Sequence, residues 1–232
     1  MRIRKGKEMK ILGVDTCSHK CSVALTDGDN TLYSIVVDMP RGHSENLFTM
    51  IETALKEAKL DIDDVDAFSC SVGPGAFTGI RVGISSIKAL SLATDKPAIG
   101  IRSADAIVAG LSKQDKHILV ALESKRKDVY WQLFDNNLQP INEMSLSLAS
   151  DVAEQIKDEN LLVIGDGAIH FKGLLPKSKI TFDIDCPLPE NICKLAKDML
   201  ESNTYEGTCE PLYLRDADVS KPKNLIIPRI EK

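Results

Sequence analysis

The first part of the chain shows two kinds of hydrophobic pattern in succession. Three short runs of apolar and β-branched residues, separated by turn residues, predict three consecutive antiparallel strands. Apolar residues then recur at intervals of three and four, which predicts an amphipathic helix, and a buried-type strand and a second helix follow. The predicted strands are 9–16, 21–28, 31–39 and 65–72, and the predicted helices begin at Ser44, as N-cap, and span Thr78–Ala93.

The second half of the chain repeats this order in a shorter form. It opens with a strand, a short basic turn and a strand, and continues with a helix, a strand that ends in a glycine turn, and a helix. These elements are predicted at 117–124, 128–135, 148–158, 161–167 and 187–201. Two halves that both open with a β-hairpin indicate an ancient duplication, with its boundary near 97–103.

Composition narrows the class of protein. The chain has 232 residues, 43 % apolar and 27 % charged, which is typical of a globular protein. Its net charge is −5, with +4 in the first ten residues and therefore −9 over the rest, so the body is poorly suited to holding a phosphate backbone alone. No apolar run is long enough for a membrane span, and six cysteines without a disulfide pattern indicate reduced thiols in a cytoplasm.

The loop before the second helix is a candidate anion or nucleotide site. Gly73 and Gly75 allow tight backbone turns, and Thr78 is placed to cap the helix, whose first amides would face a bound anion. Asp15 and Thr16 end the first strand, where they would point into the same cleft. The alternative is a tight strand-to-helix turn without a ligand, because the chain has no Walker-type lysine.

The second helix carries small residues at a regular spacing. Gly79 and Gly83 are four residues apart, and Ser86, Ile87 and Leu90 continue the same stripe. Small residues allow close approach of a neighbouring element. That element is either part of this chain's own core or a helix of another subunit, and the sequence leaves both open.

Metal and nucleophile motifs are incomplete. Cys17, His19 and Cys21 crowd onto one turn, but structural zinc needs four ligands, usually in two pairs, and no second pair completes the set. The chain has four histidines and no HxxxH or HExxH pattern, and no GxSxG nucleophile motif. We therefore expect neither a metal site nor an independent hydrolase.

Five segments together resemble the bacterial TsaB (YeaZ) family, over about residues 9–216. In chain order they are ILGVDTCSHKCSVAL, RGHSENLFTMIETAL, SVGPGAFTGIRVGISSIKALSLA, VIGDGA and EPLYLR. The resemblance implies an α/β fold of the actin-like ATPase (ASKHA, ribonuclease H-like) class with a reduced second half. The implied subdomains are 9–102 and 103–220, with 221–232 as a tail. Because the first predicted strand begins at Met9, we expect residues 1–8 to be an extension or a mis-assigned start.

The resemblance also implies that the chain catalyses no reaction of its own. The larger TsaD relatives transfer threonylcarbamoyl to tRNA and hold a metal through a helix-borne HxxxH, whereas the corresponding stretch 101–110 here has no histidine. This implies a non-catalytic subunit that binds and activates TsaD, with the ATPase TsaE as third partner and tRNA met only through the complex. No cofactor is implied beyond weak ATP or ADP binding.

The implied interface lies on the two helices of the first half, against TsaD or, in its absence, a second copy of this chain. We expect it to bury more than roughly 1,000 Å². The candidate interface residues are Leu47, Met50, Ile51, Ala54, Gly79, Gly83, Ser86, Ile87 and Leu90. The competing hypotheses are a free-standing metal-dependent nucleotide hydrolase built on Asp15 and Thr16, and a nucleotide-sensing homodimer.

Overall fold

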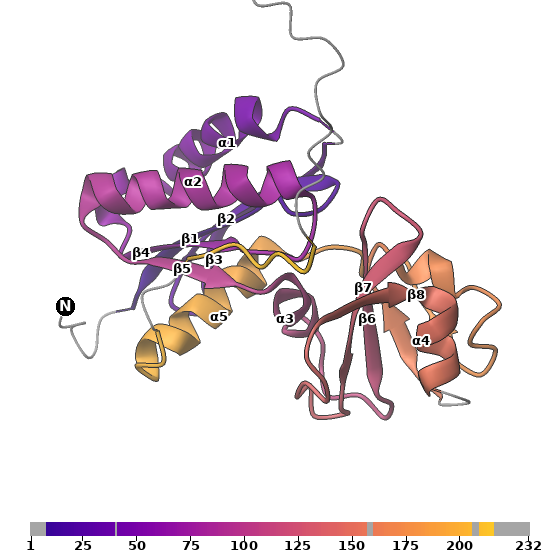
Figure 1. Cartoon of the computed structure of the whole chain (residues 1–232). Coiled ribbons are helices and arrows are strands. Elements are labelled where there is room, and N and C mark those ends of the chain that lie inside the picture. Colours follow the sequence, from indigo (N-terminus) through magenta and orange to yellow (C-terminus); the bar gives the residue numbers. More distant parts are fainter. Residues whose placement is uncertain (1–7, 40, 157–159, 206–208, 216–232) are drawn as a thin grey trace, which may run out of the picture.

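Two sheets with the same connectivity form the frame of the molecule (Figure 1). The computed structural model describes residues 8–39, 41–156, 160–205 and 209–215. Within them the strand orders are β3-β2-β1-β4-β5 and β8-β7-β6-β9-β10. In each sheet the first three strands are antiparallel neighbours, and the fourth and fifth strands run parallel to the first. The predicted α/β fold of two related, hairpin-first halves is confirmed.

The elements follow the predicted order, with additions. The first sheet and its helices are β1 (Lys10–Asp15), β2 (Lys20–Asp27), β3 (Asn30–Asp38), α1 (His43–Ala58), η1 (Ile62–Asp64), β4 (Ala67–Ser71), α2 (Phe77–Thr94), β5 (Ala98–Ile101) and α5 (Pro189–Glu201). The second sheet and the remaining helices are α3 (Ser103–Val108), β6 (Ile118–Glu123), β7 (Asp128–Phe134), β8 (Ser145–Leu148), α4 (Ala149–Ile156), β9 (Leu162–Ile164), η2 (Ala168–Phe171) and β10 (Lys179–Ile180).

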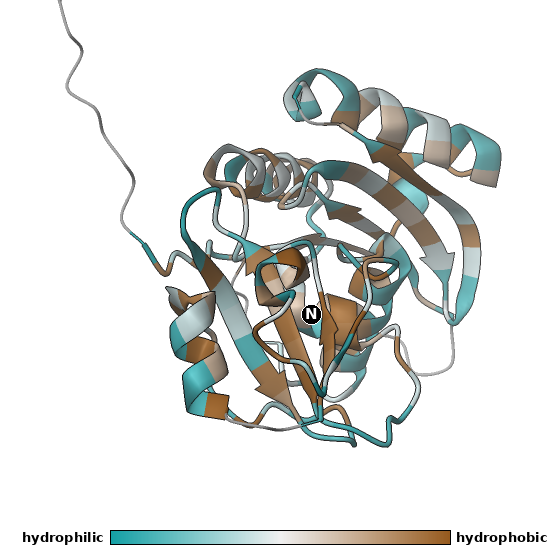
Figure 2. Ribbon diagram, turned by 90° about the vertical axis from the view of Figure 1, so that its right-hand side faces the viewer, coloured by the Kyte–Doolittle hydropathy of each residue, from teal (hydrophilic) through white to brown (hydrophobic). Residues whose placement is uncertain are grey.

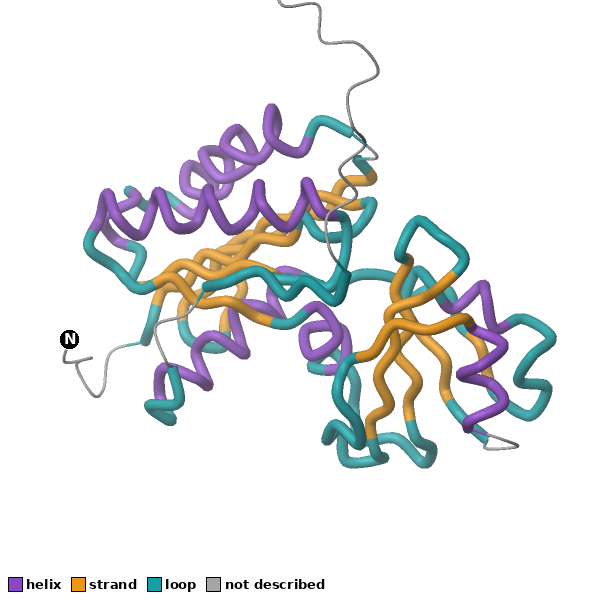
Figure 3. Tube along the Cα trace, viewed as in Figure 1, coloured by secondary structure: helices purple, strands orange, loops and turns teal. Residues whose placement is uncertain are grey.

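Helices cover both faces of the first sheet (Figure 3). Because successive side chains of a strand point to opposite faces, β1 contributes to two cores. Leu12 and Val14 pack in the cluster that includes the buried residues of α1 and α2, whereas Ile11 packs in the cluster under α5. The helices are amphipathic, and Figure 2 shows that they carry both hydrophobic and hydrophilic residues.

The last helix, α5, returns to the first sheet although the sequence places it in the second half. It packs against β1, β2 and β4. Its approach is close at Gly13, where a Cβ would lie 2.6 Å from Sγ of Cys193. Residues 189–201 thus belong to the fold of the first half, although they follow the proposed subdomain boundary at 102/103. The boundary remains a prediction.

The helix α3 joins the two halves. All but one of its six residues are buried, and it contacts both β6 and α5. On the other face of the second sheet, α4 and η2 cover a core that includes Trp131 and Phe171. The second half is thus held to the first through α3, from the face opposite α4.

Two predicted helix caps are wrong. Gly42, in a left-handed conformation with φ 86°, precedes α1, so Ser44 lies inside the helix rather than at its cap. Ala76 is the cap residue of α2, without a side-chain hydrogen bond, and Thr78 is exposed in the first turn. The predicted tail 221–232 lies outside the described residues.

Candidate functional site

Asp15, which the sequence suggests as a possible nucleotide or anion contact, lies at the end of β1. Asp15 is fully buried. One carboxylate oxygen accepts a hydrogen bond from the Cys17 amide at 3.2 Å, and the other accepts one from the Ser18 hydroxyl at 3.0 Å. Burial raises the pKa of this carboxyl, which opposes its ionisation. The Asp15 carboxylate thus forms its hydrogen bonds within the turn that follows β1.

Thr16 holds the end of β1 against α2. Its hydroxyl donates a hydrogen bond to the Gly79 carbonyl at 2.7 Å. A Cβ added at Gly79 would lie 1.8 Å from the Thr16 carbonyl oxygen, and one at Gly83 would lie 2.7 Å from its hydroxyl oxygen. Both glycines are therefore needed for packing within this chain, the first of the two alternatives that the sequence leaves open.

The loop that leads into α2 is packed in the same way. The Ala76 amide donates a hydrogen bond to the Cys17 carbonyl at 2.7 Å, which ties the loop to the turn after β1. Gly73 has a φ of +104°, a conformation that favours glycine, as the sequence predicts. Its carbonyl accepts a hydrogen bond from the Ser103 amide at 2.9 Å, so the loop also fixes the start of α3.

The second half contributes a matching set of polar groups to the cleft. Asp166 accepts a hydrogen bond from the Glu123 amide at 2.8 Å, and burial raises the pKa of its carboxyl. The Glu123 side chain lies 2.9 Å from His170, and the His19 ring lies 3.9 Å from Asp166 and 3.5 Å from Asp185. No local pattern in the sequence marks this cluster, because its members come from four separate segments.

The space left between these groups is small. The cavity lined by His19, Pro74, Glu123 and Asp166, among others, measures about 20 Å³. Sites for drug-sized ligands measure roughly 300–1,000 Å³, and a volume near 20 Å³ holds about one water molecule. The cleft between the two sheets is closed by the chain's own residues.

A larger cavity of about 440 Å³ lies beside the closed cleft, at the start of α2. Gly75 and Thr78 line it, whereas Asp15, Thr16 and Gly73 do not. Its lining includes three aromatic and three basic residues: Phe77, Tyr130, Tyr213, Lys125, Arg126 and Arg215. Two of the five predicted anion-contact residues, Gly75 and Thr78, thus line an open cavity. Lys125 and Arg126, from the basic turn of the second half, line the same cavity.

The predicted interface residues of α1 and α2 point inward. The buried ones are Leu47, Met50, Ile51, Ala54, Gly79, Gly83, Ser86 and Ile87, and Leu90 is half-buried. They pack against the first sheet because the apolar stripe of a surface helix faces its own core. A Gly83→Leu substitution would therefore disrupt the packing of α2 within this chain, and its effect would not report on a contact with a partner protein.

The outer surface of the two helices is formed by different residues. We call it the outer helix surface and define it by exposed residues of α1 and α2: Phe48, Thr49, Ser85, Ala89 and Leu92. Phe48 is 45 % exposed and Leu92 is 87 % exposed. Exposed apolar side chains such as these are available to a partner, and the exposed charged residues Arg81 and Lys88 of α2 contact Tyr213 and Glu210.

Two further properties hold for the part of the chain that the structure describes. It contains no group of three or more histidine, cysteine, aspartate or glutamate side chains arranged to hold a metal ion. None of its helices combines the length and the apolar character that a membrane crossing requires.

Comparison with known proteins gives a consistent result. Residues 38–185 match the family model described as TsaD, tRNA N6-adenosine threonylcarbamoyltransferase. Two proteins named tRNA threonylcarbamoyladenosine biosynthesis protein TsaB are similar to the chain. The one from Escherichia coli is 26 % identical, covering 90 % of this chain and 95 % of that protein. The one from Buchnera aphidicola subsp. Schizaphis graminum is 34 % identical, covering 68 % and 78 %.

A solved structure shows the same fold. YeaZ from Pseudomonas aeruginosa superimposes with a TM-score of 0.77 at 23 % identity. The match covers 89 % of this chain and all of that one. The two-sheet arrangement described above is therefore shared over nearly the whole molecule.

Proposed function

Since this chain belongs to the TsaB/YeaZ family and takes part in tRNA threonylcarbamoyladenosine biosynthesis, we propose that it is a non-catalytic activating subunit. Its partner is TsaD, the subunit that transfers threonylcarbamoyl to the adenosine beside the anticodon of tRNAs reading codons that begin with A. TsaE is the third member. The chain itself turns over no substrate, needs no cofactor and works in the cytoplasm.

The closed cleft is the observation that carries this proposal. An enzyme of the competing class, a nucleotide hydrolase, would hold its nucleotide between the two sheets, beside Asp15 and Thr16. Both residues are buried. Asp15 is hydrogen-bonded within its own turn, and Thr16 is hydrogen-bonded to α2. The cavity between the two halves measures about 20 Å³. A nucleotide needs a volume more than ten times larger.

The outer helix surface is the proposed contact with TsaD. It replaces the buried residues that the sequence suggested, on the same two helices. In the absence of TsaD the same surface pairs with a second copy of this chain. The net charge of −5 supports a role in which tRNA is held by the complex and not by this chain alone.

Activation is then a shift in the conformations of TsaD. A protein that binds one conformation better than another increases the population of that conformation by its difference in affinity. We propose that the outer helix surface binds the TsaD conformation able to hold threonylcarbamoyl-adenylate and tRNA. Binding of this chain and of those substrates to TsaD would then be mutually favourable.

The test is threonylcarbamoyl transfer to tRNA in a reconstituted mixture of TsaD, TsaE, threonylcarbamoyl-adenylate and ATP. We expect modification to depend on added chain, while the chain alone hydrolyses no ATP. Asp15→Asn should activate as well as the wild type, because the proposal gives this carboxylate no chemical role. Modification that proceeds equally without the chain, with folded partner proteins, would refute the proposal. So would ATP hydrolysis by the chain that Asp15→Asn abolishes.

A further inference from the structure

Two cysteines far apart in the sequence are in contact in the core of the first half. Sγ of Cys70 lies 3.5 Å from Sγ of Cys209, although the two residues are 139 positions apart in the sequence. Cys70 belongs to β4, in the interior of the sheet, and Cys209 belongs to a segment that follows α5. Both thiols are buried and free. They are close enough that a small approach would bring them to bonding distance.

The segment that carries Cys209 runs between the two halves of the molecule. We call Cys209–Arg215 the C-terminal strap. The Leu212 amide donates a hydrogen bond to the Val72 carbonyl at 2.8 Å, and Tyr213 accepts one from Arg81 of α2 at 2.9 Å. Arg215 pairs with Asp128 of β7. The strap therefore connects β4 and α2 with the second sheet.

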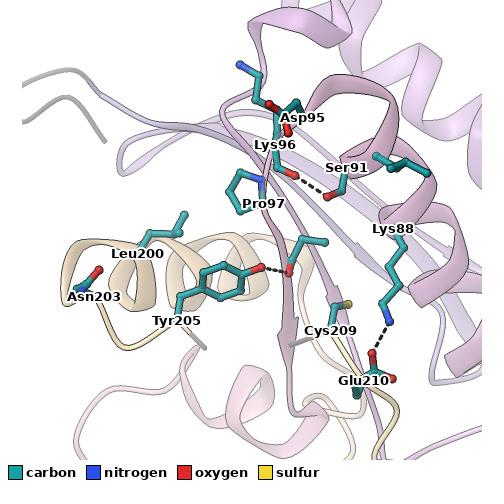
Figure 4. A pocket seen from close by; sticks show the side chains of 12 residues that line it. Lys88, Ser91, Asp95, Lys96, Pro97, Leu200, Asn203, Tyr205, Cys209 and Glu210 are labelled. Carbon is teal, nitrogen blue, oxygen red and sulfur yellow. Dashed lines mark hydrogen bonds and ion pairs between the residues drawn. The ribbon is translucent and has the colours of Figure 1, made fainter. Parts of the chain in front are cut away.

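A cavity borders Cys209, which is 2 % exposed, whereas Cys70 is fully buried. The cavity measures about 640 Å³ and is lined by Cys209 together with Lys88, Glu210 and Tyr205, among others. Figure 4 shows the Cys209 sulfur beside the ion pair of Lys88 and Glu210. Cys70 is not part of this lining. Of the two thiols, Cys209 is thus the one that a small oxidant reaches first.

The surroundings also make the two thiols chemically unequal. The hydrogen bond from Cys70 lowers the pKa of the Cys209 thiol, and the nearby Lys88 ammonium lowers it further. The same contact with Cys209, together with burial, raises the pKa of the Cys70 thiol. Thiolates are the nucleophilic form of cysteine, so Cys209 is suited to react first and Cys70 to react second.

We propose that Cys70 and Cys209 form a reversible disulfide when the protein meets a hydroperoxide, which fastens the C-terminal strap to β4. In the first step the Cys209 thiolate attacks one oxygen of hydrogen peroxide. The O–O bond breaks, an S–O bond forms, and the leaving hydroxide takes a proton to become water. In the second step the Cys70 sulfur attacks Cys209 Sγ, the S–S bond forms, the S–O bond breaks, and a second water leaves with the Cys70 proton.

Two of the four other buried cysteines lie beside backbone carbonyls. Cys193 lies against the backbone carbonyls of Ile11 and Ala24, at 3.5 and 3.8 Å. Cys17 lies 3.3 Å from the carbonyl of Ser71. The contacts of the Cys193 sulfur are with these oxygens, whereas Sγ of Cys70 contacts another sulfur. Cys193 therefore serves as the matched control for a buried thiol outside the pair.

The experiment maps disulfides in the full-length chain. The reduced protein is treated with hydrogen peroxide, free thiols are alkylated during denaturation, and peptides are analysed by mass spectrometry without reduction. We expect a peptide pair that joins Cys70 to Cys209, and its loss on treatment with dithiothreitol. Two results would overturn the proposal: both thiols still free after oxidation, or Cys209 oxidised to sulfinic acid without the cross-link.

Two variants assign the order of the steps. In Cys209→Ser we expect Cys70 to stay reduced at peroxide concentrations that cross-link the wild type, because the attacking thiolate is gone. In Cys193→Ser we expect the cross-link to form as in the wild type. Equal oxidation of Cys70 in Cys209→Ser would contradict the proposed order. Because the wild-type mapping needs no substitution, the test stands even if one variant fails to fold.

Discussion

The Thr16 hydroxyl donates a hydrogen bond to the Gly79 carbonyl at 2.7 Å, and the Thr16 carbonyl occupies the position next to the Gly79 Cα, where any side chain would begin. This contact locks the end of β1 to the first turn of α2. Cys17, which follows Thr16, lines the small cavity between the two halves. The glycines of α2 are therefore required for the packing of α2 against β1 within this chain, whether or not a partner binds.

Replacing Gly79 with alanine should destabilise the fold strongly. The added Cβ would lie 1.8 Å from a backbone oxygen, so β1 and α2 must separate. Overpacking of a core costs about 1–3 kcal/mol, and more where backbone has to move, so we expect a loss of about 3 kcal/mol in the free energy of unfolding. Urea denaturation followed by circular dichroism measures it.

The control for this prediction is Ser85→Ala, on the exposed side of the same helix. Exposed substitutions away from special features change stability by less than about 0.5 kcal/mol. If Gly79→Ala were as stable as Ser85→Ala, the close contact between β1 and α2 would be wrong.

Replacing Asp15 with asparagine should change how stability depends on pH. Burial raises the pKa of Asp15 above the ordinary value of 3.8, so the folded protein holds this proton more tightly than the unfolded chain. The resulting stabilisation is complete below pH 3.8 and is lost as the pH rises through the raised pKa. Asparagine has no such dependence. The stability of the wild type relative to Asp15→Asn should therefore fall with rising pH.

Urea unfolding of both proteins at acidic and neutral pH measures this difference. A constant offset between the two proteins would reflect only the altered hydrogen bonds to Cys17 and Ser18. An offset that moved in favour of the wild type with rising pH would contradict the raised pKa.

Magnesium ATP should leave the melting temperature of the isolated chain unchanged. A ligand that binds only the folded state at a hundred times its dissociation constant adds about 2.7 kcal/mol of stability, which differential scanning fluorimetry detects easily. A cleft of about 20 Å³ gives a nucleotide no such site. A concentration-dependent rise with ATP, absent with an equal concentration of magnesium chloride, would show that the cleft opens or that the 440 Å³ cavity at α2 binds the nucleotide.

Placing an acidic side chain on the outer helix surface should weaken binding to TsaD. Phe48 is 45 % exposed, so Phe48→Asp should leave the fold intact while it puts a charge into the proposed contact. We expect the dissociation constant to rise at least about tenfold, as for a central apolar contact, measured by calorimetry.

Ile141→Asp provides the matched control, because Ile141 is 51 % exposed and lies outside the two helices. It should bind TsaD as the wild type does. If both variants bound equally well, the contact would have to lie on another face of the molecule.

The sequence by itself determined the succession of elements and the two hairpin-first halves. Alternation and helical spacing are local patterns, and they placed β1–β4, α1, α2, β6 and β7 within a few residues of their observed bounds. They did not predict β5, β8, β10 or α3, which have six residues or fewer. Elements this short are predicted only where an apolar run and turn residues mark them clearly, as at β1, β4 and β6.

Only the tertiary structure decided what each apolar face packs against. The spacing of Leu47, Ile51, Gly79 and Gly83 marks a face that is buried, but a helix is equally periodic whether its own sheet or another subunit covers it. The closed cleft, the return of α5 to the first sheet and the pairing of Cys70 with Cys209 likewise depend on contacts between distant segments. Such contacts leave no local pattern, because they form only when the whole chain is packed.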